Sequence, residues 1–231
     1  MPMAHMSALR TYSCTREMLC AIERIRACKS QWITTADAIL IASLVFSVAG
    51  LAAVSQTPSQ MPVKAQDGVS RTDWSVSFTD WSEVRIKAYK RAMEKPLPSA
   101  LAVLTVPRLG LHAPLFEGTD DATLDLGLGH IAGTAHPNEI GNLGIAGHRD
   151  GFFRPLKDIR AGDTVELTTS GQISTYSVDR VEIVGPKDVR VLKSSRKSTL
   201  TLVTCYPFYF YGHAPQRYIV EASLIRTSPQ P

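Results

Sequence analysis

The chain has 231 residues, of which 44% are hydrophobic, so it is long enough for one well-buried domain with a tail and too short for two full domains. Its formal net charge is +4, but the residues from position 56 onward hold 20 Lys and Arg against 18 Asp and Glu. This balance offers no strong field for phosphates, which argues against nucleic acid as a partner.

The first predicted element is an apolar helix near the N-terminus. Residues 38–54 form a run of 17 residues without charge, which as a helix spans about 26 Å and nearly crosses a bilayer core. With Trp32 and Ile33 added, we predict a transmembrane anchor at 32–55. Five basic residues precede the run and few follow it, so the positive-inside rule places residues 1–31 in the cytoplasm and the rest of the chain outside.

Two other interpretations of this run remain open. A cleaved signal peptide is the second, because Ala53-Val54-Ser55 has the small residues that a signal peptidase accepts. The preceding segment and the run itself are both longer than a signal peptide normally has, so we favour the uncleaved anchor. A buried core helix is the third, although the N-terminal tail contains nothing to cover its other face.

Residues 56–99 predict a stalk followed by an amphipathic helix. The segment 56–73 is polar with Pro and Gly, which is typical of a flexible stalk. Asp80 and Glu83 have the spacing of a capping box and predict a helix that runs to about Lys95. Its apolar stripe, which we expect to dock on the folded domain rather than to recognise a partner, consists of Trp81, Val84, Ala88 and Ala92.

The pattern from 100 to 226 is typical of one mainly β domain, followed by a C-terminal tail at 227–231. Seven short apolar or alternating runs predict strands at 101–106, 109–116, 142–146, 164–169, 173–184, 199–204 and 217–224. Short helical pieces are expected at 121–126 and 153–159. So many short strands within this length favour a compact barrel or sandwich.

Cys205 is the only cysteine after the apolar run, since the other three lie in the predicted cytoplasmic tail. A cysteine placed outside the membrane is either buried and inert or kept for its reactivity. A reactive thiol requires a nearby base or a lowered pKa, and the acyl oxygen that it attacks requires a hydrogen-bond donor.

Two residues at other predicted strand ends are candidates for these helper roles. His148 follows the apolar run 143–146, and Arg217 begins the last strand. If the strand that ends at Cys205 and the strand that begins at Arg217 form an antiparallel hairpin, these two residues lie side by side. The loop between them is long enough for other pairings, and the sequence sets no distance to His148.

The segments around these three residues resemble those of sortases, most closely class D. Thr201-Leu202-Val203-Thr204-Cys205 matches the TLxTC motif of that family, and its histidine and arginine fall in segments like Gly147-His148-Arg149-Asp150 and Gln216-Arg217-Tyr218. The resemblance covers roughly residues 100–224. Pro137-Asn138-Glu139 stands where many relatives have Pro-Gly-Glu, a difference that affects a turn and no catalytic position.

The resemblance implies an eight-stranded sortase-type β-barrel with short helices after an N-terminal transmembrane helix, and a cysteine transpeptidase activity. It implies that Cys205 attacks a Thr-Gly or Thr-Ala bond in the C-terminal sorting motif of a secreted protein. The resulting thioacyl enzyme is then resolved by an amine of peptidoglycan or of a pilin. His148 is expected to act as general acid and then base, Arg217 to hold the substrate or its oxyanion, and Thr204 to line that site.

The aromatic run after Cys205 predicts either a groove wall for an apolar substrate residue or packing against the barrel. Tyr206 and Phe208 are its predicted substrate-binding members. The resulting prediction is a single-pass enzyme of the cell (inner) membrane, with the lipid bilayer contacting residues 32–55 and the catalytic domain outside the cytoplasm.

No cofactor is required by this chemistry. Some sortases bind calcium through carboxylates in a loop of the region that here holds Glu117, Asp120, Asp121 and Asp125. Oxygen ligands suit that ion, although a solvated acidic loop is the favoured interpretation. His130 and His136 are expected to shape the substrate groove, and a metal site formed by them is the less favoured interpretation.

Two rival functions fit the same residues. One is a cysteine hydrolase of the cell envelope, which would share the nucleophile and lack the amine acceptor. The other is a non-catalytic scaffold for surface proteins, in which Cys205 is merely buried.

Overall fold

The computed structural model describes residues 76–210 and 212–230. The predicted cytoplasmic tail, the anchor and most of the stalk therefore lie outside the described residues, and the domain boundaries placed there stay predictions. Among the helices of the described part, none has the length and apolar character needed to cross a membrane.

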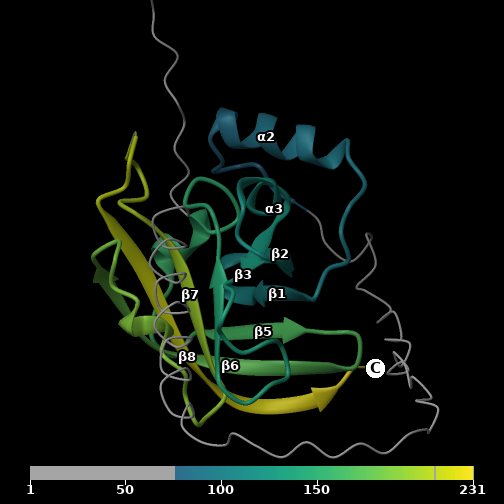
Figure 1. Ribbon diagram of the computed structural model, residues 1–231, viewed down its shortest axis with the longest axis vertical. Coiled ribbons are helices and arrows are strands. Elements are labelled where there is room, and N and C mark those ends of the chain that lie inside the picture. Colours follow the sequence, from purple (N-terminus) through teal and green to yellow (C-terminus); the bar gives the residue numbers. More distant parts are fainter. Residues whose placement is uncertain (1–75, 211, 231) are drawn as a thin grey trace, which may run out of the picture.

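Eight strands close into a barrel in the order β1-β2-β3-β4-β7-β8-β6-β5, and β5 pairs back onto β1 (Figure 1). Their bounds are β1 Ala102–Val106, β2 Leu111–Glu117, β3 Leu128–His130, β4 Asn142–Ala146, β5 Thr164–Thr168, β6 Gln172–Val184, β7 Thr199–Tyr206 and β8 Gln216–Pro229. The pairs β2–β3 and β4–β7 are parallel and the others antiparallel. The mainly β, eight-stranded barrel that the resemblance implies is confirmed.

The inward faces of the strands supply the core. Leu104, Leu115, Ile145 and Leu202 come from four different strands and are all fully buried in one apolar cluster. Because side chains alternate between the two faces of a strand, each strand contributes every second residue to this interior. The core therefore fixes the register of the strands and, with it, the positions of the residues at their ends.

Strand β3 is the element that the apolar pattern does not predict. It has only three residues, and Gly129 stands at its centre. A Cβ atom at this glycine would lie 2.2 Å from the carbonyl oxygen of Gly118, so the close approach of these backbones requires glycine. A strand this short, with a glycine inside it, carries no β-strand signal in the sequence.

Helix α2, Glu83–Met93, lies against the barrel and beside α3, Asp121–Leu126 (Figure 1). The expected docking of α2 is confirmed by Tyr89, which is buried in the core cluster. Two details of the prediction are wrong: the N-cap is Ser82 rather than Asp80, and Val84 of the predicted stripe is 71% exposed. The three short 3-10 helices are η1 Pro107–Leu109, η2 Arg154–Asp158 and η3 Arg190–Leu192.

Asn138 takes up the turn in the β3–β4 loop. Its φ is +70°, in the left-handed region that glycine adopts freely and asparagine tolerates better than most residues. The Asn138 side chain also donates to Thr169 Oγ1 at 3.1 Å and accepts from Gln172 Nε2 at 2.6 Å. These bonds anchor the β3–β4 loop to the neighbouring β5–β6 hairpin.

Candidate active site

Cys205 and Arg217 face each other across the last hairpin. Strands β7 and β8 pair antiparallel, and in their register Cys205 is opposite Arg217. The hairpin that the sequence analysis proposed as one possibility is therefore present. Both residues are buried, and Nη1 of Arg217 donates to the carbonyl oxygens of Ala214 and Gln216 at 3.1 and 3.0 Å.

His148 reaches the same end of the barrel from strand β4. This strand runs parallel to β7, and Ala146 pairs with Val203. The Gly147 amide continues the ladder by donating to the Val203 carbonyl oxygen at 3.2 Å, which brings His148 level with Cys205. The three candidate residues of the sequence, Cys205, His148 and Arg217, thus lie at the ends of β7 and β4 and at the start of β8, on the same side of the barrel.

The backbone before His148 is held by two specific contacts. The Thr204 hydroxyl donates to the Gly147 carbonyl oxygen at 2.7 Å. A Cβ atom at Gly147 would lie 2.6 Å from the Phe153 ring, so the packing of that buried ring requires glycine here. The Thr204 hydrogen is therefore used to position the histidine segment, and a contact of Thr204 with substrate stays a prediction.

The His148 ring is buried among charged neighbours. Its Nε2 lies 3.9 Å from Oδ1 of Asp125, which comes from α3, and makes no hydrogen bond within the described part of the chain. Burial and, to a smaller extent, the positive charge of Arg85 together lower the pKa of His148 to about 3, and Asp150 partly opposes this shift. The resting imidazole is therefore neutral near pH 7.

Arg85, from helix α2, is one of the charged residues around His148. The Arg85 guanidinium pairs with Asp125 and, through Nε at 3.4 Å, with Asp150. The Ser82 hydroxyl caps α2 by accepting from the Arg85 amide and donates to Asp150 Oδ2 at 2.7 Å. Burial alone would raise the pKa of Asp150, but Arg85 and Ser82 outweigh it and keep this pKa below its usual value.

This charged network is not predicted from the sequence. The contacts that Asp125 makes with Arg85 and His148 form only when α2 and α3 dock on the barrel. The same holds for the pair of Arg85 with Asp150, and no local pattern in the sequence reveals this docking. The one available signal is Ser82, because serine is a preferred N-cap residue and marks the true start of α2.

The aromatic run after Cys205 divides between packing and exposure. Phe208 is buried in the core and Tyr206 packs against it at a ring distance of 6.1 Å, whereas Tyr209 is 72% exposed. The packing interpretation thus holds for Tyr206 and Phe208, whereas a groove wall for substrate stays a prediction. Roles for Tyr206 and Phe208 in substrate binding stay predictions, and Tyr211 lies outside the described residues.

Arg149 ties the histidine segment to the loop that follows Cys205. Its guanidinium donates to the carbonyl oxygens of Pro207, Phe210 and Gly212 at 3.1, 2.7 and 2.9 Å. Three donors of one planar group thus hold three points of the β7–β8 loop. We infer that this loop and the His148 segment keep a fixed relative position.

Three of the four carboxylates considered for calcium have separate partners. Asp120 caps α3 by accepting from the amide and the hydroxyl of Thr123, and Asp125 pairs with Arg85. Asp121 is exposed in the first turn of α3, and Glu117 faces His130 and His136. A calcium site among them stays a prediction.

Comparison with known proteins points to one family. A family model described as the Sortase domain matches residues 104–225. Sortase D of Bacillus subtilis (strain 168) is 35% identical over 136 residues, which cover 58% of this chain and 69% of the relative.

Two solved structures extend this likeness to the fold. A Sortase D5 transpeptidase from Clostridium perfringens has 30% identity and a TM-score of 0.51, with 64% of this chain and 91% of that chain covered. Sortase E1 from Streptomyces coelicolor, solved with a tripeptide in the active site, has 27% identity and a TM-score of 0.51, with 56% and 90% covered.

Proposed function

This chain belongs to the sortase family of cysteine transpeptidases, and we propose that it transfers the acyl part of a C-terminal sorting motif to an amine through Cys205. The observation that carries this proposal is the meeting of three strand ends. The start of β8 places Arg217 opposite Cys205, and the end of β4 places His148 level with both.

In the first step, the Cys205 sulfur attacks the peptide carbonyl carbon and its proton passes to His148. Because the pKa of His148 is lowered, its resting ring is neutral and has a ring nitrogen available to accept that proton. As the C–N bond breaks, the imidazolium returns the proton to the leaving amine. The products of this step are a thioacyl enzyme and a peptide with a new N-terminus.

Arg217 is suited to the negative charge that develops on the carbonyl oxygen. Its guanidinium is buried, and its bonds to Ala214 and Gln216 leave it oriented before any substrate arrives. A preorganised cation in a site poor in water stabilises an oxyanion far more than the same cation would in water. The guanidinium also keeps its charge throughout, since an arginine side chain is not deprotonated in proteins.

In the second step, an incoming amine attacks the thioacyl carbon while His148 accepts its proton. The C–S bond breaks, an amide forms, and the sulfur recovers a proton from the imidazolium. We propose a peptide as the acyl donor and an amine of peptidoglycan or of a pilin as the acceptor. The tripeptide in the active site of the Streptomyces coelicolor relative supports a peptide donor.

We further propose that the enzyme acts outside the cytoplasm, held to the cell membrane by the span predicted at 32–55. Secreted proteins meet the active site there, after their own export. This part of the proposal rests on the apolar run and the charge asymmetry around it.

The experiment separates transfer from hydrolysis and from scaffolding. The full-length chain is incubated in detergent with a panel of peptides that contain a Thr-Gly or Thr-Ala bond near the C-terminus, with triglycine present or absent. We expect an amide product that requires both triglycine and Cys205. Peptide cleavage without an amide product, at the same rate with and without triglycine, would identify a hydrolase.

A thiol-selective electrophile provides a control that does not depend on the sorting motif. We expect labelling of Cys205 in the folded chain at a rate that falls when His148 is replaced by alanine. A folded chain that resists labelling at Cys205 would support the scaffold.

A further inference from the structure

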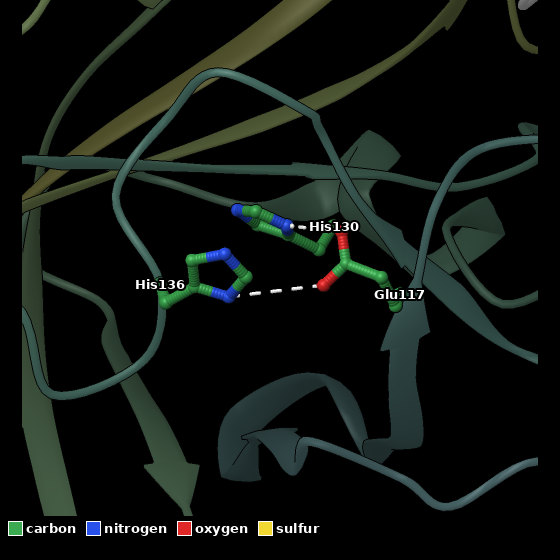
Figure 2. Close-up of side chains that lie close together, drawn as sticks. All are labelled: Glu117, His130 and His136. Atoms are coloured by element: carbon green, nitrogen blue, oxygen red, sulfur yellow. Dashed lines mark hydrogen bonds and ion pairs between the residues drawn. The ribbon is translucent and has the colours of Figure 1, made fainter. Parts of the chain in front are cut away.

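Glu117, His130 and His136 form a cluster outside the proposed active site. Glu117 ends β2, His130 ends β3, and His136 lies in the β3–β4 loop. One ligand atom from each lies within 4.8 Å of the other two. Figure 2 shows both rings turned toward the Glu117 carboxylate, with an interaction drawn from His136 to one of its oxygens.

The proton on His130 is fixed by its neighbours. The Thr134 hydroxyl donates its only hydrogen to the Ile131 carbonyl oxygen at 2.7 Å, so it can only accept from His130 Nε2, 3.2 Å away. The Ala135 carbonyl oxygen, 3.1 Å from Nε2, is also an acceptor. Nε2 of His130 therefore carries a hydrogen, and in the neutral ring Nδ1 presents a lone pair.

Nδ1 of His130 faces a carboxylate. His130 Nδ1 lies 3.0 Å from Glu117 Oε1, and His136 Nδ1 lies 3.7 Å from Oε2 of the same group. The His130 and His136 rings also contact each other, with their centroids 4.2 Å apart and their planes tilted by 35°. The Glu117 carboxylate therefore faces a ring nitrogen of each histidine, and a metal cation that took the place of the proton shared between His130 and Glu117 would bind both groups at once.

We propose that Glu117, His130 and His136 bind a divalent transition metal ion such as Zn²⁺. Two imidazole nitrogens and one carboxylate oxygen suit zinc, whereas calcium prefers oxygen ligands alone. Zinc bonds of about 2.0–2.2 Å in a tetrahedron place ligand atoms roughly 3.4 Å apart, between the two distances from Glu117 to the histidines.

The surroundings of the cluster match those of a metal ligand set. A metal-bound histidine usually donates its other ring N–H to a carbonyl group, as His130 does to Ala135. His130 is 1% exposed, while the His136 side chain is 49% exposed and can close on an ion from solvent. The outward side leaves the fourth position to water. A bound ion would clip the β3–β4 loop to the ends of two strands.

The test measures zinc binding by isothermal titration calorimetry. The full-length chain is used in detergent with serine in place of all four cysteines, because thiolates bind zinc elsewhere in the chain. We expect one saturable site per chain. His136→Ala, which alters an exposed side chain, and Glu117→Gln, which preserves its size, should each weaken binding by at least about tenfold. Even residues that only hydrogen-bond to a metal ligand are worth roughly 10- to 100-fold in affinity.

His213→Ala provides the matched control, because it removes an exposed histidine outside the cluster. We expect it to bind zinc as the parent does, and zinc-edge X-ray absorption to show two imidazole ligands in both. Absence of saturable binding at millimolar zinc, or equal binding by the His136→Ala and His213→Ala variants, would overturn the proposal. A His130 ring that nitrogen NMR shows doubly protonated in the presence of zinc would do the same.

Discussion

Asp125 Oδ1 lies 3.9 Å from Nε2 of His148, although the first residue belongs to α3 and the second follows β4. Arg85 of α2 pairs with the same carboxylate. Burial lowers the pKa of His148 most, the positive charge of Arg85 lowers it further, and the negative charge of Asp150 raises it. A carboxylate as close as that of Asp125 also favours the imidazolium. The proposed acid and base of the reaction is tuned by helices outside its own strand.

Replacing Asp125 by asparagine should lower the apparent pKa of His148 in the working enzyme. A carboxylate at this distance stabilises the imidazolium, and its removal should shift the acidic limb of the kcat/KM profile by about one unit to lower pH. Transfer rates measured across pH check this. Asp121→Asn makes the same charge change on the exposed side of α3, and an equal shift there would refute a local effect of Asp125.

Replacing Arg85 by methionine should have the opposite sign. Because Arg85 lowers the pKa of His148, its loss should raise that pKa toward 6.5, which NMR titration of the ring resonances would detect. Asp125 and Asp150 also lose a partner in a partly buried setting, so the free energy of unfolding should fall by about 1–3 kcal/mol. Arg91→Met, on the same helix, is the control. A His148 pKa that stays in place would contradict the assigned role of Arg85.

The depressed pKa of His148 makes stability depend on pH. In the unfolded chain His148 binds a proton near pH 6.5, whereas in the folded chain it binds one only near pH 3. The free energy of unfolding should therefore decrease as the pH is lowered from about 6.5 to about 3. Above pH 6.5, His148 should not make it depend on pH.

Comparison with His148→Gln isolates this contribution. The difference in unfolding free energy between parent and variant should change with pH by at most about 1.4 kcal/mol per unit, as measured by denaturant unfolding. His213→Gln, at an exposed position, should run parallel to the parent. A parallel curve for His148→Gln would show that the ring titrates normally in the folded chain.

Arg217 offers a test of the proposed oxyanion contact. Arg217→Gln removes the charge and should lower kcat by roughly 100- to 1,000-fold, the usual effect of losing one such donor. Arg217→Lys keeps the charge but lacks the planar guanidinium, so its kcat should lie between that of the parent and that of Arg217→Gln. Acyl-transfer rates are compared with thermal unfolding of each variant. Loss of rate that only follows loss of folded protein would assign Arg217 a structural role.

The sequence predicts the core of the proposed site because its members stand at strand ends. The runs that lead to Cys205 and His148 are strongly apolar, and the final strands are adjacent in the chain. A hairpin is the simplest arrangement for them, and the observed opposition of Cys205 and Arg217 follows from it. The position of His148 requires the parallel pairing of β4 with β7, a crossover that no short-range pattern encodes.

Elements governed by tertiary contacts escape the sequence analysis. Strand β3 has three residues and a central glycine, so neither alternation nor β propensity marks it. The spacing predicts a capping box at Asp80, but Ser82 is the N-cap of α2. The Ser82 hydroxyl also donates to Asp150, a contact with a residue far along the chain that the local pattern does not reveal. The Glu117 cluster with His130 and His136 likewise assembles residues from two parallel strands and a loop.

Intact-mass spectrometry of the acid-quenched full-length chain, after brief mixing with a cleaved peptide, tests the central claim most directly. We predict a mass gain equal to the N-terminal part of the peptide, located on the fragment that contains Cys205 and discharged when triglycine is added. The Cys205→Ala variant should show neither the adduct nor the product. Transfer by that variant, or an adduct located on another residue, would contradict Cys205 as the acyl carrier.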